Sequence, residues 1–143
     1  MKSILVTFPG GKKVDAAFDG FVVHTDQSRE HDGDGSAPEP FALFLASLAT
    51  CAGLYALAFC RARSLSTDGL RLTQHNTFDA HGQLQRVHMT ITLPRDFPAR
   101  LTGAICTAVG ACKVKKALGT PPELLVDTAL AGARAHEDDG RTA

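Results

Sequence analysis

The segment FALFLASLATCAGLYALAFC, residues 41–60, contains no charged side chain and constrains the fold more than any other part of the sequence. Twenty such residues are long enough, as a helix, to cross a lipid bilayer. However, the segment is rich in Ala, also contains Ser47, Thr50 and Gly53, and lies between strand-like segments in the middle of the chain. A helix that is apolar on every side also suits a soluble core or an oligomer interface. We therefore predict a buried helix of a soluble protein.

The residues before this segment carry signals for the start of a helix. Ser36 and Glu39 form the pattern Ser-x-x-Glu, which is typical of a capping box, where both side chains bind backbone N–H groups of the first turn. Pro38 and Pro40 suit that turn because its N–H groups have no partner within the helix. We expect the helix to run to about Arg63.

Short apolar segments separated by turn residues flank the helix and predict an α+β fold. Asp19 and Gly20 separate two of them, and Asp-Gly favours a type I′ hairpin because both central residues need positive φ. The remaining pattern predicts strands at 3–8, 14–18, 21–25 and 123–130, a hairpin at 69–80 and 83–93, and helices at 98–109 and 112–118. We expect one domain over residues 1–130 and a loose tail at 131–143.

Composition excludes several classes of function. Fifteen basic residues balance fifteen acidic ones, so the sequence predicts no nucleic-acid partner and no anionic membrane partner. Four cysteines in 143 residues do not make a disulfide scaffold. The first residues, MKSILVTFPGGKK, lack the apolar run of a signal peptide. We predict a cytoplasmic protein whose thiols are mostly reduced.

The spacing of possible ligands predicts no metal site and no cofactor. Eight residues separate Cys51 from Cys60, and five separate Cys106 from Cys112, whereas structural zinc sites use shorter pairs. The loop EHDGDG, residues 30–35, resembles the start of a calcium loop. Its twelfth position should be a bidentate glutamate but is Phe41.

Cys112 is a candidate reactive thiol. It follows Gly110, opens the predicted helix at 112–118, and precedes three lysines at positions 113, 115 and 116. A helix N-terminus and nearby ammonium groups both stabilise a thiolate. The alternative is an ordinary residue at a helix start beside solvated lysines.

Two stretches of the chain resemble the OsmC/Ohr-like proteins, the osmotically inducible protein C and organic hydroperoxide resistance group. They are Pro40 through Cys51, which contains LASLATC, and ACKVKKAL at 111–118. The order of elements is also similar over about residues 3–130. The resemblance implies an intertwined α+β homodimer, with the long helices buried centrally and the pockets at the dimer interface.

The resemblance also implies a thiol peroxidase reaction. Cys51 matches the peroxidatic cysteine, whose thiolate attacks an organic hydroperoxide and becomes a sulfenic acid. Cys112 matches the resolving cysteine, and a dithiol reductant then reduces the Cys51–Cys112 disulfide. We expect their Cα atoms to lie within about 7 Å of each other. Phe41 replaces the glutamate of the best-studied relatives, and no arginine precedes Arg29, so Arg29 and the lysines at 113–116 are the only obvious sources of the activating cation.

A binding module is the alternative function. Apolar side chains of the long segment would line a pocket for a small apolar ligand at the dimer interface, and the cysteines would be idle. The candidates are Phe41, Phe44, Leu48, Leu54, Tyr55 and Phe59. In both readings Cys60 and Cys106 serve only in packing.

Overall fold

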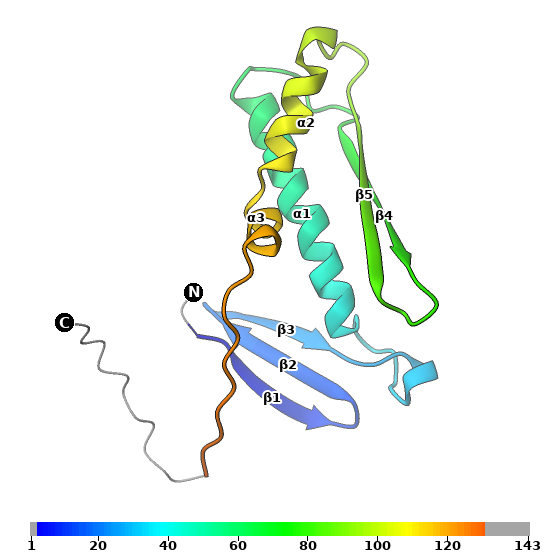
Figure 1. Ribbon diagram of the computed structural model, residues 1–143, viewed down its shortest axis with the longest axis vertical. Coiled ribbons are helices and arrows are strands. Elements are labelled where there is room, and N and C mark those ends of the chain that lie inside the picture. Colours follow the sequence, from blue (N-terminus) through cyan, green and yellow to red (C-terminus); the bar gives the residue numbers. More distant parts are fainter. Residues whose placement is uncertain (1–2, 131–143) are drawn as a thin grey trace, which may run out of the picture.

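The structure is a computed structural model that describes residues 3–130, and one long helix forms its axis (Figure 1). In chain order the elements are β1 (Leu5–Gly10), β2 (Lys13–Phe18), β3 (Phe21–Thr25), α1 (Pro40–Arg61), β4 (Arg71–Phe78), β5 (Leu84–Thr92), α2 (Thr102–Gly110) and α3 (Lys113–Gly119). Short 3-10 turns at Arg29–His31 and Ala99–Leu101 precede α1 and α2. The α+β fold is confirmed. The single domain at 1–130 stays a prediction, and the tail at 131–143 lies outside the described residues.

The core lies along one side of α1. Side chains four residues apart lie on one face of a helix, and Leu48, Ala52 and Ala56 form such a buried row, continued by Phe59 and Cys60. Ile105 and Val109 of α2 pack against this row, and apolar side chains of the β4–β5 hairpin adjoin it. The predicted helix is confirmed, but in the isolated chain it is buried on one side only.

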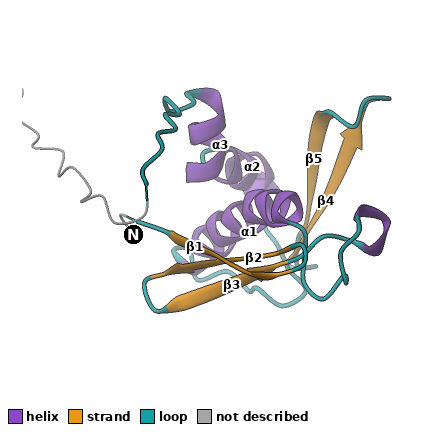
Figure 2. Ribbon diagram, turned by 90° about the horizontal axis from the view of Figure 1, so that it is seen from below, coloured by secondary structure: helices purple, strands orange, loops and turns teal. Residues whose placement is uncertain are grey.

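The other sides of α1 leave apolar side chains exposed, including Phe41 and Leu54. By length and composition, α1 could also cross a membrane, because it has 22 residues and a mean hydropathy of 2.0. Figures 1 and 2 show the β1–β3 sheet beyond the first residues of α1, set apart from the body formed by α1, α2 and the β4–β5 hairpin.

Turn chemistry sets the register of the first sheet. Asp19 has a φ of 46° and Gly20 a φ of 81°, as a type I′ turn requires. Phe18 therefore lies opposite Phe21, and β2 pairs antiparallel with both β1 and β3. The hairpin predicted from Asp19-Gly20 is confirmed.

The capping box predicted at Ser36 and Glu39 is wrong. The helix begins at Pro40, so Glu39 itself is the N-cap residue, and its side chain does not cap the helix. The Glu39 Oε1 atom instead accepts from Ser28 N at 3.0 Å. Ser36 donates through N and Oγ to Asp26 Oδ2, at 3.0 and 2.7 Å. Both side chains therefore hold the loop before α1.

The final strand predicted at 123–130 is also wrong for the isolated chain. These residues form neither a strand nor a helix. The Leu125 side chain is 77% exposed, and its neighbours Leu124, Val126 and Leu130 are more exposed still. A strand needs a neighbouring strand to satisfy its backbone N–H and C=O groups, and no strand among the described residues pairs with this segment.

Asp26 is expected to stabilise the loop before α1 in a pH-dependent way. Its carboxylate is buried and accepts hydrogen bonds from Gln27 N at 2.8 Å and from Ser36. The bonds from Ser36 are the main reason that the pKa of Asp26 falls to about 2. A carboxyl with a lowered pKa stabilises the fold above its ordinary pKa of about 4, and this stabilisation is lost as the pH falls toward 2.

Asp26→Asn should therefore melt about 5 °C below the wild type at pH 6, with a smaller difference at pH 2. Thermal unfolding followed by circular dichroism at several pH values gives both numbers. The exposed Asp68→Asn serves as the matched control. Parallel curves for the wild type and Asp26→Asn across this pH range would exclude the role of the Asp26 charge.

Candidate functional site

The two cysteines of the resemblance lie on adjoining helical elements. Cys51 lies eleven residues into α1 and is partly exposed. Cys112 is the N-cap residue of α3, and its side chain is 0% exposed. Helix α3 contacts α1, so the fold brings the two elements together, while a Cys51–Cys112 bond stays a prediction. All four cysteines are free thiols in this structure.

Backbone geometry explains the position of Cys112. Helix α2 ends at Gly110, and Cys112 N donates to Val109 O at 3.3 Å. Cys112 then leaves the helical conformation, with φ −63° and ψ 149°, and its carbonyl accepts from Lys116 N to start α3. This break turns the Cys112 side chain into the protein interior. The predicted place of Cys112 at a helix start is confirmed.

Within residues 3–130, neither the Cys51 thiol nor the Cys112 thiol takes part in a hydrogen bond. Arg29, the first candidate cation, donates through Nε to Asp34 O at 3.3 Å in the loop before α1. Cys51 lies about 16 Å further along the helix axis. Lys113 and Lys116 are exposed, and Lys115 lines a cavity to which Cys51 does not contribute. These contacts therefore do not place Arg29 or any of the three lysines beside Cys51.

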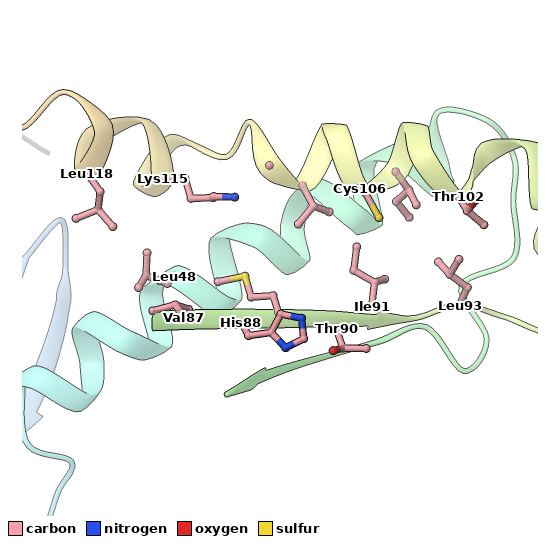
Figure 3. A pocket seen from close by; sticks show the side chains of 14 residues that line it. Leu48, Val87, His88, Thr90, Ile91, Leu93, Thr102, Cys106, Lys115 and Leu118 are labelled. Atoms are coloured by element: carbon pink, nitrogen blue, oxygen red, sulfur yellow. The ribbon is translucent and has the colours of Figure 1, made fainter. Parts of the chain in front are cut away.

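A cavity of about 660 Å³ lies between α2, α3 and β5 (Figure 3). Its walls are mainly apolar, and its polar side chains include Lys115, Cys106 and Thr102. Of the side chains predicted to line an apolar pocket, only Leu48 contributes to it. Tyr55 and Phe59 line a separate hollow. This cavity is therefore a different site from the predicted pocket at a dimer interface, which stays a prediction.

Two further cysteines differ in their surroundings. Cys106, predicted to pack in the core, is exposed and lines the cavity, since the buried face of α2 consists of Ile105 and Val109. Cys60 is buried as expected. Burial raises the pKa of the Cys60 thiol, although nearby Arg63 acts in the opposite direction. Cys60 therefore has less thiolate than an ordinary thiol and suits a packing role.

A polar cluster that the sequence pattern did not indicate lies before α1. The His31 Nδ1 atom is 3.0 Å from Ser28 Oγ and 3.2 Å from Glu39 Oε1. Hydrogen bonds from Ser28 are the main reason that the pKa of Glu39 is lowered, and His31 adds to this effect. In a serine nucleophile triad the serine and the carboxylate bind opposite ring nitrogens. Here both contact Nδ1, so the cluster holds the loop and is not a nucleophile.

Similarity to solved structures supports the fold. A protein from Psychrobacter arcticus 273-4, described in terms of osmotic stress induction and a detoxification response, has 22% identity and a TM-score of 0.70 over 82% of this chain and 88% of its own. An OsmC-like protein from Mycoplasma pneumoniae has 18% identity and a TM-score of 0.63 over 82% and 86%. A Legionella pneumophila organic hydroperoxide resistance protein OsmC, described as a predicted redox protein, has 18% identity and a TM-score of 0.54 over 82% and 90%.

Sequence comparison identifies the family. A search of curated protein sequences gives no significant match. The family model of the OsmC-like proteins matches residues 33–126, which is more than half of the chain and includes both Cys51 and Cys112. This match agrees with the helix and cysteine pattern of the sequence and with the fold of the solved structures. The chain therefore belongs to the OsmC-like protein family.

Proposed function

We propose that this protein is a cysteine-based redox protein that reduces organic hydroperoxides through Cys51 and Cys112. The proposal rests on the difference in exposure between the two thiols. Cys51 is partly exposed on α1, whereas Cys112 is fully buried at the start of α3, which contacts α1. A thiol that attacks a hydroperoxide must be reached by it, and a resolving thiol needs only to reach the first cysteine. We therefore assign Cys51 as the thiol that attacks the hydroperoxide and Cys112 as the resolving thiol.

The reaction balances without a metal or a cofactor. The Cys51 thiolate attacks the terminal oxygen of the hydroperoxide, the O–O bond breaks, and the alkoxide takes a proton to leave as an alcohol. The sulfenic acid at Cys51 then condenses with the Cys112 thiol, forming a disulfide and releasing water. A dithiol reductant restores both thiols by exchange and becomes a disulfide itself. These steps suit the reduced thiols of a cytoplasmic protein, which is the location that we propose.

A homodimer belongs to this proposal because the isolated chain leaves much apolar surface exposed. One face of α1 is uncovered, and the β1–β3 sheet exposes Leu5, Phe8 and Phe21. Exposed apolar patches of this kind mark interaction sites. A second copy would cover these surfaces, offer a neighbouring strand to residues 123–130, and bring side chains toward Cys51. The cation that the thiolate needs would come from that copy.

The alternative is a binding module for a small apolar ligand. The 660 Å³ cavity favours it, because its size and mainly apolar lining are typical of small-molecule sites. Cys51 does not line this cavity, so a ligand bound there would leave Cys51 unaffected.

Dithiol-dependent consumption of cumene hydroperoxide tests the proposed function. The untagged protein with dithiothreitol should consume the hydroperoxide well above the rate of dithiothreitol alone, and prior alkylation of the thiols should remove the excess. Ligand binding would not produce such turnover. A rate equal to that of dithiothreitol alone would favour the binding module.

A further inference from the structure

Two histidines face each other across the β4–β5 hairpin. His75 is the direct partner of His88 in the antiparallel register. Both are exposed, while their neighbours Gln74 and Met89 point toward the opposite, half-buried face. His88 also borders the 660 Å³ cavity, and Figure 3 shows its imidazole ring beside β5, apart from α2 and α3. Within residues 3–130, neither imidazole has a hydrogen-bond partner.

The spacing of the two histidines allows both side chains to bind the same metal ion. Directly opposed residues on one face of an antiparallel pair have Cβ atoms about 4.5–5.5 Å apart. Metal–nitrogen bonds of about 2.0–2.1 Å place two adjacent ligand nitrogens about 3 Å apart. Rotation about the two side-chain torsions of each exposed histidine can bring the ring nitrogens to that separation. The paired backbone fixes the spacing of the two side chains in advance.

We propose that His75 and His88 together bind one divalent ion of the Ni²⁺, Cu²⁺ and Zn²⁺ series. Neutral imidazole is a preferred ligand of these ions. Water would complete the coordination, with the hydroxyls of Thr73 and Thr90 at the next position along the same face. Ca²⁺ and Mg²⁺ do not suit the pair because they require oxygen ligands.

The surrounding charges set a limit on affinity. Arg86 lies two residues from His88 on the same face, opposite Thr77, and its positive charge disfavours a dication. Arg71 lies further along the face, opposite Thr92. The part of the chain that the structure describes holds no group of three or more His, Cys, Asp or Glu arranged for a metal. The site therefore consists of two protein ligands. It does not depend on the proposed redox function.

Titration of the untagged, metal-free protein with Ni²⁺ by calorimetry tests the site. We choose Ni²⁺ because, unlike Cu²⁺, it does not oxidise thiols. The wild type should bind one Ni²⁺ per chain at this site, and His75→Asn or His88→Asn should each weaken it at least about tenfold by removing the second ligand. Ni²⁺ should also raise the melting temperature of the wild type more than that of either variant.

His81→Asn is the matched control, because His81 is exposed in the loop of the same hairpin and has no histidine opposite. Its affinity for Ni²⁺ should equal that of the wild type. The three substituted positions are exposed, so all variants should fold, and circular dichroism checks this. Equal affinity of the wild type and the double variant His75→Asn/His88→Asn would overturn the proposal and assign any bound Ni²⁺ to other residues, such as the thiols.

Discussion

Cys51→Ser is expected to abolish hydroperoxide turnover, while Cys112→Ser is expected to stop the cycle after its first step. A serine hydroxyl is not ionised at neutral pH and does not replace the thiolate, so the Cys51 variant should fall to the rate of the reductant alone. Without Cys112, attack on the hydroperoxide survives but the disulfide cannot form. Cys51 should then gain one oxygen as a sulfenic acid. Steady-state rates and intact-protein mass spectrometry measure the two outcomes.

The remaining cysteines provide matched controls. Cys60→Ser places a hydroxyl in a fully buried position and should lower stability more than activity. Cys106→Ser should change neither, because Cys106 is exposed. Loss of turnover in Cys106→Ser, with Cys51→Ser still active, would move the chemistry to the 660 Å³ cavity and contradict the assignment of Cys51.

The protein is expected to be a homodimer that a single charge can dissociate. Light scattering should give twice the 15.1 kDa mass of the chain, and the interface should bury well over ~2,000 Å². Phe8 is 79% exposed in the isolated chain, so Phe8→Asp would be harmless in a monomer. In a dimer that buries Phe8, the charge loses its water, and the dimer should weaken at least about a hundredfold.

Leu125→Asp extends the same test to the segment at 123–130, which has no neighbouring strand within residues 3–130. Thr77→Asp is the control, because Thr77 lies on the polar outer face of β4. It should leave the mass unchanged. A wild-type mass of 15.1 kDa at micromolar concentration would contradict the proposed dimer. It would also contradict the proposal that the second copy provides the cation near Cys51.

Local signals of the sequence predicted much of the fold. The apolar segment at 41–60 predicted α1 because a run of that length without charge suits a helix that is buried on several sides. Asp19-Gly20 predicted its hairpin because the required φ angles are local properties of those two residues. The segment at 123–130 has the same strand-like pattern, but a strand also needs a neighbour, which a pattern within one segment does not reveal.

The candidate site was less predictable because its features depend on tertiary contacts. Ser36 matched a local capping pattern, yet the buried carboxylate of Asp26 binds it instead. Cys106 occupies an apolar helix, and only the packing of α2 decides that its neighbour Ile105 is the buried residue. His75 and His88 are thirteen residues apart, and only the register of β4 and β5 places them together.

Disulfide mapping after a single oxidation shows whether Cys51 and Cys112 form a bond during the reaction. The reduced wild type is treated with one equivalent of cumene hydroperoxide, quenched with an alkylating reagent, digested and analysed by mass spectrometry. We predict a peptide pair linked through Cys51 and Cys112, with Cys60 and Cys106 alkylated as free thiols. Free thiols at both Cys51 and Cys112, together with no added oxygen at Cys51 in Cys112→Ser, would contradict the account.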